Sequence, residues 1–370
     1  MRKIILTSNL YLPNIGGIEN SLKHLAEVGS KDTELTIVSS NIVEGQQNHS
    51  CGLQNENGYN IVRYNVPPLK NKYLKAFVHI LSAIKTYRKL KDKHTIIVAR
   101  YHLNVIFAYF SGFKDIRYLV PGVVKNQNNK NNRSNSNRIS YFIDCLFQKL
   151  AFKVARKTFV FSDSMFAQVK DICPEINIIK VRPGIDSNRF FVGDMNNNET
   201  VNLLIVSRLV AAKGISFAIE ALNYLPSNYT LTIVGEGPDR NELTKIVDDN
   251  KLSTRVFFVG KTSTPEQFYK KCDIFLLPSI YEPFGQTILE ASACGLPTVA
   301  FDPQIVSTAT IEILGDRAFL AGKLDSESYA IAIKHAFMKL RCDDNFRDDI
   351  HQFIINKYSW KRLFDEIIYS

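Results

Sequence analysis

Short apolar runs rich in β-branched residues alternate along the chain with longer segments whose apolar residues recur at helical spacing. This alternation is typical of parallel strands joined by crossover helices. It predicts strands at residues 3–8, 34–38, 95–98, 116–120, 158–161, 176–180, 202–206, 229–234, 256–259, 274–277 and 298–300. Because the Pro183-Gly184 pair interrupts the series, we expect two doubly wound α/β domains, residues 1–184 and 185–355. A helix at about 356–370 would return to the first domain.

One helical segment of the first half is both apolar and basic. Residues 73–90 place Leu74, Phe77, Leu81 and Ile84 along one stripe, with Lys and Arg elsewhere. We interpret the segment as a crossover helix that packs on the sheet, and a membrane-surface helix is the alternative.

A second segment, residues 125–138, contains no apolar residue. Because it has nothing to bury, we expect a mobile loop. Such a loop could be a lid, a surface that faces an acceptor, or a dispensable insertion.

The composition is that of an ordinary globular protein. Of the 370 residues, 45% are hydrophobic and 22% charged, which excludes wholesale disorder, collagen and coiled coil. No apolar run reaches the length of a membrane span, and the first one is too short for a signal peptide, so we expect a cytoplasmic protein. The six cysteines form no C-x-x-C pair, which argues against a disulfide framework and a zinc site and indicates reduced, mostly buried thiols.

Charge is distributed unevenly between the two halves. Residues 1–190 contain 28 Lys and Arg against 13 Asp and Glu, a net charge of +15, whereas residues 191–370 contain 18 against 23, a net charge of −5. This asymmetry indicates that the first domain meets an anionic surface, which could be lipid, nucleic acid or a phosphorylated substrate. No basic motif interleaved with aromatic residues supports nucleic acid.

The most informative stretch is residues 275–301, where a buried strand leads into Glu282-Pro283-Phe284-Gly285 and then a helix that carries Glu290. Ligands of open α/β sheets bind at the carboxyl ends of the strands, and a helix start suits a phosphate. Glu282 and Glu290 are eight residues apart, so a ligand that touches both must be extended. Since a carboxylate accepts two donors at once, glutamate is a natural partner for ribose and sugar hydroxyls.

Weaker motifs accompany this stretch. Arg208 and Lys213 follow the first strand of the second domain, where two cations can neutralise a diphosphate. A Gly-Glu-Gly-Pro turn begins at Gly235, and Gly16-Gly17 follows the first strand of the chain. Each of these alone is more simply a structural turn or a surface charge, but their order along the chain is informative.

That order runs Gly16-Gly17-Ile18-Glu19, Pro183-Gly184-Ile185-Asp186, Arg208 to Lys213-Gly214, Gly235-Glu236-Gly237-Pro238, and Glu282-Pro283-Phe284-Gly285 to Glu290. It resembles the retaining glycosyltransferases of GT-B architecture, in the large family 4-like group that includes bacterial mannosyl- and glucosyltransferases of cell-surface polysaccharide synthesis. The resemblance is strong over residues 177–301 and looser before them. It implies two Rossmann-like domains that face each other across a cleft, the first on the acceptor side and the second holding a nucleotide sugar.

The resemblance also implies roles for individual residues. Arg208 and Lys213 would stabilise the departing diphosphate, and Glu282 would face the transferred sugar, so these three are the catalytic candidates. The donor-binding candidates are Gly16, Gly17, Gly235, Phe284, Gly285, Gln286, Thr287 and Glu290, with Glu290 on the ribose hydroxyls. Structural alternatives stay open: Glu282 as a helix cap, Glu290 as a solvated helix residue and Gly235 as a turn residue.

For the reaction, the resemblance implies retention of the anomeric configuration by front-face attack, with the departing phosphate oxygen taking the acceptor proton. We expect no metal and no other cofactor, and the sequence contains no D-x-D triplet to hold a divalent ion. No pair of facing carboxylates for a double displacement is evident, which is compatible with this route without establishing it.

The first domain departs from the family at one position. Members often carry a histidine that contacts the donor sugar after the strand at 117–120, where this chain has Pro121-Gly122. His102, close to Arg100, follows an earlier strand instead. Arg100 and His102 are therefore candidates for acceptor or sugar contacts, and a structural histidine is the favoured alternative for His102.

We therefore expect an enzyme that moves a hexose-type sugar from a nucleotide diphosphate, most simply UDP, to a growing glycan. If that glycan is lipid-linked, the basic first domain would dock as a peripheral protein on the anionic inner face of the membrane; no nucleic-acid partner is expected. Two alternatives use the same architecture: a nucleotide-sugar epimerase, and a catalytically silent subunit that binds a nucleotide sugar.

Overall fold

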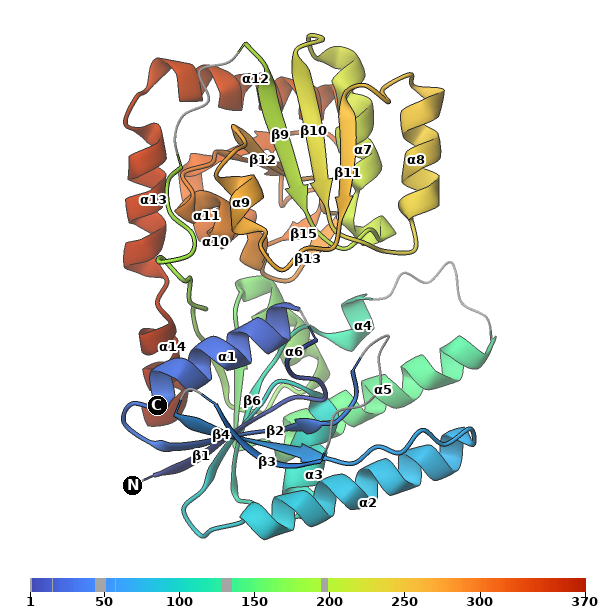
Figure 1. The fold of residues 1–370 in the computed structure, drawn as a ribbon, viewed down its shortest axis with the longest axis vertical. Coiled ribbons are helices and arrows are strands. Elements are labelled where there is room, and N and C mark those ends of the chain that lie inside the picture. Colours follow the sequence, from blue (N-terminus) through green and yellow to red (C-terminus); the bar gives the residue numbers. More distant parts are fainter. Residues whose placement is uncertain (1, 15, 44–50, 57, 128–134, 194–198) are drawn as a thin grey trace. The chain divides into compact units, whose positions relative to one another are not determined.

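The computed structural model describes residues 2–14, 16–43, 51–56, 58–127, 135–193 and 199–370. The chain divides into two compact units, Met1–Gly184 with Trp360–Ser370, and Ile185–Ser359. Each unit is built on one large sheet with helices packed against it (Figure 1).

The sheet of the first unit has eight strands in the order β3-β4-β2-β1-β5-β6-β7-β8. Its strands are β1 (Lys3–Thr7), β2 (Glu34–Ser40), β3 (Gly52–Glu56), β4 (Tyr59–Tyr64), β5 (Ile96–Ala99), β6 (Asp115–Leu119), β7 (Lys157–Val160) and β8 (Ile178–Lys180). All neighbours pair in parallel except β3 and β4. The chain moves outward from β1 on one side and from β5 on the other, so the direction of winding reverses between these two central strands.

The sheet of the second unit is wholly parallel, in the order β11-β10-β9-β12-β14-β16. Its strands are β9 (Val201–Val206), β10 (Tyr229–Val234), β11 (Val256–Gly260), β12 (Ile274–Leu277), β14 (Thr298–Phe301) and β16 (Ala318–Ala321), and β13 (Tyr281–Glu282) pairs separately with β15 (Ser307–Thr308). β12 and β14 are buried along their whole length, which explains their continuous apolar sequences. Here the winding reverses between β9 and β12.

Helices connect the strands in both units. Those of the first unit are α1 (Gly17–Gly29), α2 (Lys72–Leu90), α3 (His102–Phe110), α4 (Val124–Gln127), α5 (Asn135–Val154), α6 (Asp163–Ile172) and α14 (Trp360–Tyr369). Those of the second are η1 (Ala211–Lys213), α7 (Ile215–Ala221), η2 (Leu222–Tyr224), α8 (Arg240–Asp249), α9 (Glu266–Tyr269), α10 (Gln286–Ala293), α11 (Thr310–Leu314), η3 (Gly315–Arg317), α12 (Ser326–Cys342) and α13 (Phe346–Lys357).

The last helix, α14, belongs to the first unit, as expected from the sequence. Its Trp360 ring stacks on His24 of α1 at a centroid distance of 5.1 Å. Gly29 of α1 leaves room for the Phe364 ring, because a Cβ at that position would lie 2.3 Å from it. The two ends of the described chain are therefore packed into one unit.

All eleven strands predicted from the sequence are present, with ends shifted by a few residues at most. Five further strands, β3, β4, β13, β15 and β16, were not predicted. β3 is exposed along its whole length and has no apolar alternation, and β13 and β15 contain two residues each. The pairing of β3, β13 and β15 depends on neighbouring chain segments more than on local pattern.

The prediction that α2 packs through its apolar stripe is wrong. Leu74, Phe77 and Leu81 are 49%, 59% and 50% exposed. The buried side of α2 instead carries Tyr87, whose hydroxyl is hydrogen-bonded to the hydroxyl of Thr7 at 2.6 Å. A tyrosine can pack its ring and still satisfy its polar end, so the less hydrophobic side of the helix faces the sheet.

The expected loop at 125–138 is wrong at both ends of the segment. Residues 125–127 belong to α4, and α5 begins at Asn135, while residues 128–134 lie outside the described part of the chain. The two helices are connected, because the Tyr141 hydroxyl donates to the carbonyl of Lys125 at 3.0 Å.

The cysteines are all free thiols, as expected, but fewer are buried than predicted. Cys173, Cys272 and Cys294 are buried, whereas Cys51 and Cys342 are exposed. Within the described residues, no helix combines the length and the apolar character needed to cross a bilayer.

Candidate functional site

The predicted donor site lies at the carboxyl edge of the second sheet, at the point where the winding reverses. The loop after β9 carries Arg208 and Lys213, and the loop after β12 carries Glu282. In open α/β sheets a crevice forms at this point because the loops after the two strands diverge to opposite faces. The topology therefore indicates a ligand site here without reference to any motif.

Glycines allow these loops to touch backbone to backbone. Gly214 has a φ of +56°, and a Cβ on it would lie 2.1 Å from the carbonyl oxygen of Pro278 in the loop after β12. Gly235 has a φ of +142°, and a Cβ on it would lie 1.8 Å from the carbonyl oxygen of Ser207. No other residue fits either position without moving the backbone. Gly235 thus fixes the loop after β10 against the loop that presents Arg208.

The structure brings two of the three catalytic candidates together. The ammonium of Lys213 donates a hydrogen bond to Oε2 of Glu282, and the two form an ion pair. Their side chains are only 20% and 14% exposed. Arg208 is exposed, and its guanidinium makes no hydrogen bond or ion pair with any described residue. The edge therefore presents one unpaired cation and one cation whose charge a carboxylate balances.

The loop that carries Glu282 leads directly into α10. The N-cap of this helix is Gly285, with a φ of +91° and no side-chain hydrogen bond to the helix start. Gln286 and Thr287 form its first turn. Phe284 is buried, with its ring 6.2 Å from that of Tyr358. The ion pair gives the Glu282 carboxylate a partner outside α10, and the helix-cap alternative for Glu282 stays open.

Glu290 has a partner of its own on a different helix. Its Oε2 accepts a hydrogen bond of 3.0 Å from the hydroxyl of Tyr269, the last residue of α9. Burial raises the pKa of Glu290 to about 7, an effect that the Tyr269 hydrogen bond and the charge of Arg189 partly oppose. Glu290 is thus no solvated helix residue, and its charge changes close to neutral pH.

Sequence reasoning missed Tyr269. Its ring is fully buried and contacts Phe190 and Phe275 at centroid distances of 5.9 and 5.7 Å. Nothing in the local pattern distinguishes this tyrosine from the neighbouring aromatic residue in α9. The only available signal was that a buried tyrosine hydroxyl needs a polar partner, which points to a partner without naming it.

In the first unit, Arg100 occupies the equivalent point of its sheet. It directly follows β5, and its backbone N–H donates to the carbonyl of Thr7 at the end of β1, at 2.8 Å. The side chain is 5% exposed and lies over the ring of Phe161 at 5.2 Å. Nε and Nη1 have no hydrogen-bond partner among the described residues. Burial lowers the pKa of Arg100 to about 10, and a buried cation with unmet N–H groups suits an anionic or hydroxyl-rich ligand.

His102 begins α3 and is also buried. Its Nε2 lies 3.8 Å from Oδ1 of Asp144, too far for a hydrogen bond, and its ring centroid lies 4.4 Å from that of Tyr101. These contacts fit a structural histidine as well as a ligand contact, so both interpretations stay open.

Gly16 and Gly17 form the start of α1, after β1. Gly16 is the N-cap residue of α1. A Cβ at this position would lie 2.5 Å from the carboxylate of Glu19. A Cβ on Gly17 would meet no atom within 4 Å. The backbone at Gly17 is thus open to a ligand, and its role as a donor contact stays a prediction.

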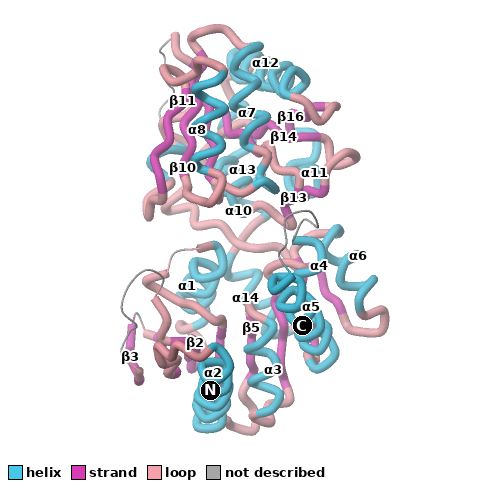
Figure 2. The backbone as a smooth tube through the Cα atoms, turned by 90° about the vertical axis from the view of Figure 1, so that its right-hand side faces the viewer, coloured by secondary structure: helices cyan, strands magenta, loops and turns pink. Residues whose placement is uncertain are grey.

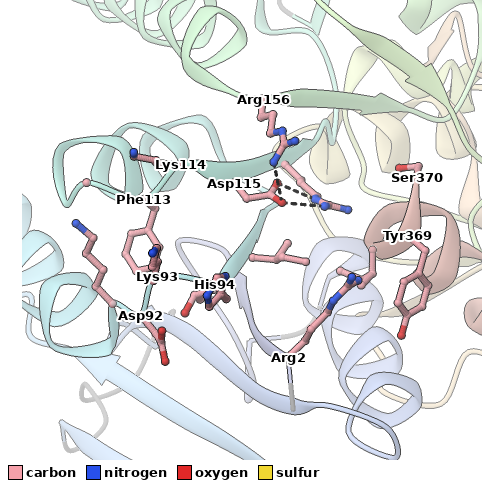
Figure 3. Close-up of a pocket in the computed structure, with 16 residues that line it drawn as sticks. Arg2, Asp92, Lys93, His94, Phe113, Lys114, Asp115, Arg156, Tyr369 and Ser370 are labelled. Carbon is pink, nitrogen blue, oxygen red and sulfur yellow. Dashed lines mark hydrogen bonds and ion pairs between the residues drawn. The ribbon is translucent and has the colours of Figure 1, made fainter.

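A cavity of about 990 Å³ lies elsewhere, at the amino edge of the first sheet. Figure 3 shows its basic lining, with Arg156 turned toward Asp115 and with Lys93 and Lys114 nearby. None of the predicted site residues lines it. It is therefore separate from the site at the carboxyl edge.

Comparison with known proteins agrees with the geometry. Residues 189–366 match the family described as glycosyl transferases group 1. The lipopolysaccharide core biosynthesis glycosyltransferase LpsE of Rhizobium meliloti is 28% identical over 163 residues, which cover 44% of this chain and 47% of LpsE. The N-acetylgalactosamine-N,N'-diacetylbacillosaminyl-diphospho-undecaprenol 4-alpha-N-acetylgalactosaminyltransferase of Campylobacter jejuni is 29% identical over 127 residues, 34% of each chain. The chain thus matches about half the length of the first relative and about a third of the second.

Solved structures resemble the chain over almost its whole length. A sucrose-phosphate synthase from Thermosynechococcus elongatus has a TM-score of 0.79 at 17% identity, covering 99% of this chain and 97% of that one. Anabaena Alr3699/HepE, solved in complex with UDP and glucose, has a TM-score of 0.77 at 17% identity, covering 100% and 99%. At this identity the likeness shows the fold, which is GT-B. The predicted α/β class and GT-B architecture are confirmed.

Proposed function

Because residues 189–366 form a glycosyltransferase group 1 domain in a chain of GT-B fold, we propose that this protein is a retaining glycosyltransferase. It would transfer a sugar from a UDP-sugar to a growing, lipid-linked cell-surface glycan. The observation that carries the proposal is the Lys213–Glu282 ion pair at the reversal point of the second sheet, with Arg208 in the same loop as Lys213.

The cations at this edge match the charge that develops in sugar transfer. Breaking the bond between the sugar C1 and the diphosphate leaves negative charge on the diphosphate, which prepositioned cations stabilise. Arg208 can bind a phosphate oxygen directly, because it has no ion-pair partner among the described residues. A second phosphate oxygen would replace Glu282 as the partner of Lys213, and the released carboxylate would then face the sugar.

The nucleotide is proposed from Glu290 and from the likeness to HepE. Glu290 can accept both ribose hydroxyls when it is ionised, and the Tyr269 hydrogen bond holds the carboxylate in place. HepE was solved with UDP and glucose. We therefore propose that the nucleotide of the donor is UDP. Transfer by front-face attack would need no divalent metal, because Arg208 and Lys213 supply the positive charge at the leaving group.

The acceptor is proposed from the relatives and from the first unit. One relative is named for lipopolysaccharide core synthesis, and the other for a diphospho-undecaprenol acceptor. Arg100 presents unmet N–H groups at the carboxyl edge of the first sheet, where they would contact the acceptor or the transferred sugar.

The test is a panel of nucleotide sugars screened by thermal shift, followed by assays of UDP release with and without acceptor. The proposal expects stabilisation by one UDP-sugar, turnover that persists in EDTA, and a product whose anomeric configuration by NMR matches the donor. Arg208→Ala/Lys213→Ala should lower turnover by at least about a hundredfold, while Lys245→Ala/Lys334→Ala, at two exposed lysines of the same unit, should not change it. Sugar interconversion without acceptor, or UDP binding without any release, would contradict the proposal.

A further inference from the structure

Three helices of the first unit present a continuous apolar surface. α3 contacts both α2 and α5, and Figure 2 shows the three helices side by side on one side of the sheet. The most exposed of their large apolar side chains are Phe77 (59%), Leu81 (50%), Phe110 (57%), Phe142 (69%) and Leu146 (56%). We call this surface, formed by α2, α3 and α5, the three-helix face.

The exposed apolar residues are arranged in stripes. In α2, Leu74, Phe77 and Leu81 recur at helical spacing, and in α5, Phe142 and Leu146 do the same. The opposite side of each helix is buried, by Tyr87 in α2 and by Phe152 in α5. Each helix is therefore apolar on two sides. Single exposed apolar residues are ordinary, but stripes on contacting helices mark a binding surface.

The charges that flank the stripes are almost all positive. The exposed basic residues of these helices are Lys75, Lys85, Arg88, Lys89, Lys149 and Lys153. α2 contains no acidic residue, and Asp144 is the only one in α5. A second copy of the chain docked symmetrically here would place like charges near one another, whereas an anionic surface would neutralise them.

The basic cavity of Figure 3 continues this charge beyond the helix ends. Lys93 follows the end of α2, Lys114 follows α3 and Arg156 follows α5, and all three line the cavity. Positive charge thus collects where all three helices end. Apolar stripes with a basic border are typical of structures that lie in the membrane interface, with apolar side chains at the headgroup boundary and Lys and Arg at the phosphates.

We propose that the three-helix face docks on an anionic lipid bilayer. Phe77, Leu81, Phe142 and Leu146 enter the interface, and the flanking Lys and Arg bind lipid phosphates. The biological reason for this docking rests on the proposed function, because a lipid-linked acceptor is presented at a membrane surface. Its physical basis is independent of that function, because it uses the exposure and charge of the first unit alone.

The experiment is co-sedimentation of the full chain with vesicles of phosphatidylcholine, with and without phosphatidylglycerol. We expect binding only to the anionic vesicles and a fall in binding as salt rises. Phe77→Ser/Leu81→Ser and, separately, Phe142→Ser/Leu146→Ser should each weaken binding by about tenfold or more. Ile331→Ser/Met338→Ser removes side chains of 49% and 52% exposure from α12 of the second unit and should leave binding unchanged.

A charge-reversal variant tests the electrostatic half of the proposal. Lys93→Glu/Lys114→Glu should lower affinity for anionic vesicles, and Lys245→Glu/Lys334→Glu, at exposed lysines of the second unit, should lower it less. Equal losses from both variants would indicate attraction by net charge alone and overturn the assignment to this face.

Two other results would also overturn it: no vesicle binding at any composition, or a dimer in sedimentation velocity that the Phe77→Ser/Leu81→Ser variant converts to monomer. UDP release measured on the same samples separates the two proposals. Vesicle binding without turnover contradicts only the proposed function, and turnover on a soluble acceptor without vesicle binding contradicts only the docking.

Discussion

Lys213 and Glu282 neutralise each other at the edge of the second sheet, although 69 residues separate them in the sequence. The pairing means that a diphosphate and Glu282 compete for the same ammonium. A donor must therefore displace a carboxylate before Lys213 can stabilise its phosphates. The strength of this competition can be measured through either partner.

The first prediction concerns Glu282→Gln. Because the variant leaves Lys213 without a charged partner, we expect it to bind free UDP a few times more tightly than the wild type does. Turnover should nevertheless fall by about tenfold or more, since the carboxylate is proposed to face the sugar in the transition state. Isothermal titration calorimetry with UDP and a UDP-release assay give the two values.

Lys213→Met is the matched control for that variant. It should weaken UDP binding and lower turnover together, and it should also lower the melting temperature, because it leaves the largely buried carboxylate of Glu282 without its charged partner. If Glu282→Gln bound UDP more weakly than the wild type, Glu282 would be a direct ligand contact and not a competitor.

The second prediction follows from the pKa of Glu290. Burial raises it from 4.5 to about 7, so the folded protein holds this proton more tightly than the unfolded chain does. Stability from this group is therefore complete below about pH 4.5 and is lost as the pH rises through about 7. The side chain of Glu290→Gln stays neutral at every pH. The melting temperature of the variant, relative to that of the wild type, should therefore rise as the pH increases from 5 to 8.

Donor binding should change in the opposite sense. If Glu290 accepts the ribose hydroxyls as a carboxylate, wild-type affinity for a UDP-sugar should rise between pH 6 and pH 8. The Glu290→Gln variant should bind the UDP-sugar more weakly, with an affinity that does not change over that pH range. Thermal shifts with and without UDP-glucose across this range measure both effects. A variant with unchanged pH dependence of stability would show that Glu290 is not the titrating group.

The sequence carried enough information for most of the fold but less for the contacts of the site. Apolar runs such as β12 and β14 are buried on both faces, so their residue types alone predict buried strands. The order of the glycines, cations and glutamates predicted which loops form the site. It did not predict that Lys213 pairs with Glu282, because that contact depends on how the loops after β9 and β12 meet.

The apolar stripe of α2 also shows what the sequence could not predict. Periodicity predicted that Leu74, Phe77 and Leu81 share one face, and they do. It could not predict which face the sheet covers, because Tyr87 offers a buried ring together with a hydroxyl for Thr7. A pattern reports that a face is apolar, whereas burial depends on what packs against it.

The third prediction compares two glycines. Gly235→Ala should lower both stability and UDP affinity, because the new Cβ would lie 1.8 Å from the Ser207 carbonyl oxygen and the residue has a positive φ. Gly17→Ala meets no atom within 4 Å, so its melting temperature should stay close to that of the wild type. If the Gly17 backbone contacts the donor, turnover should still fall. Full activity of Gly17→Ala would remove Gly17 from the donor site.

The fourth prediction uses two buried arginines of the first sheet. Arg117 donates to Asp115 from Nε and Nη2 at 3.0 and 2.9 Å, whereas Nε and Nη1 of Arg100 have no partner among the described residues. Arg117→Met should destabilise the protein by about 1–3 kcal/mol, because it breaks two charge-assisted bonds. Arg100→Met should leave stability unchanged or raise it. The substitution removes a buried charge, and Nε and Nη1 of that charge have no hydrogen-bond partner in the described chain.

Kinetics then separate a ligand contact from a structural residue. Arg100→Met should raise the acceptor KM or lower kcat by about tenfold, and Arg100→Lys should restore part of the loss, because the charge returns without the fork of donors. Chemical denaturation and initial-rate measurements on the same preparations test both halves. An Arg100→Met protein that is less stable and fully active would show that Arg100 holds the sheet edge together, and the acceptor contact would then have to lie at another residue.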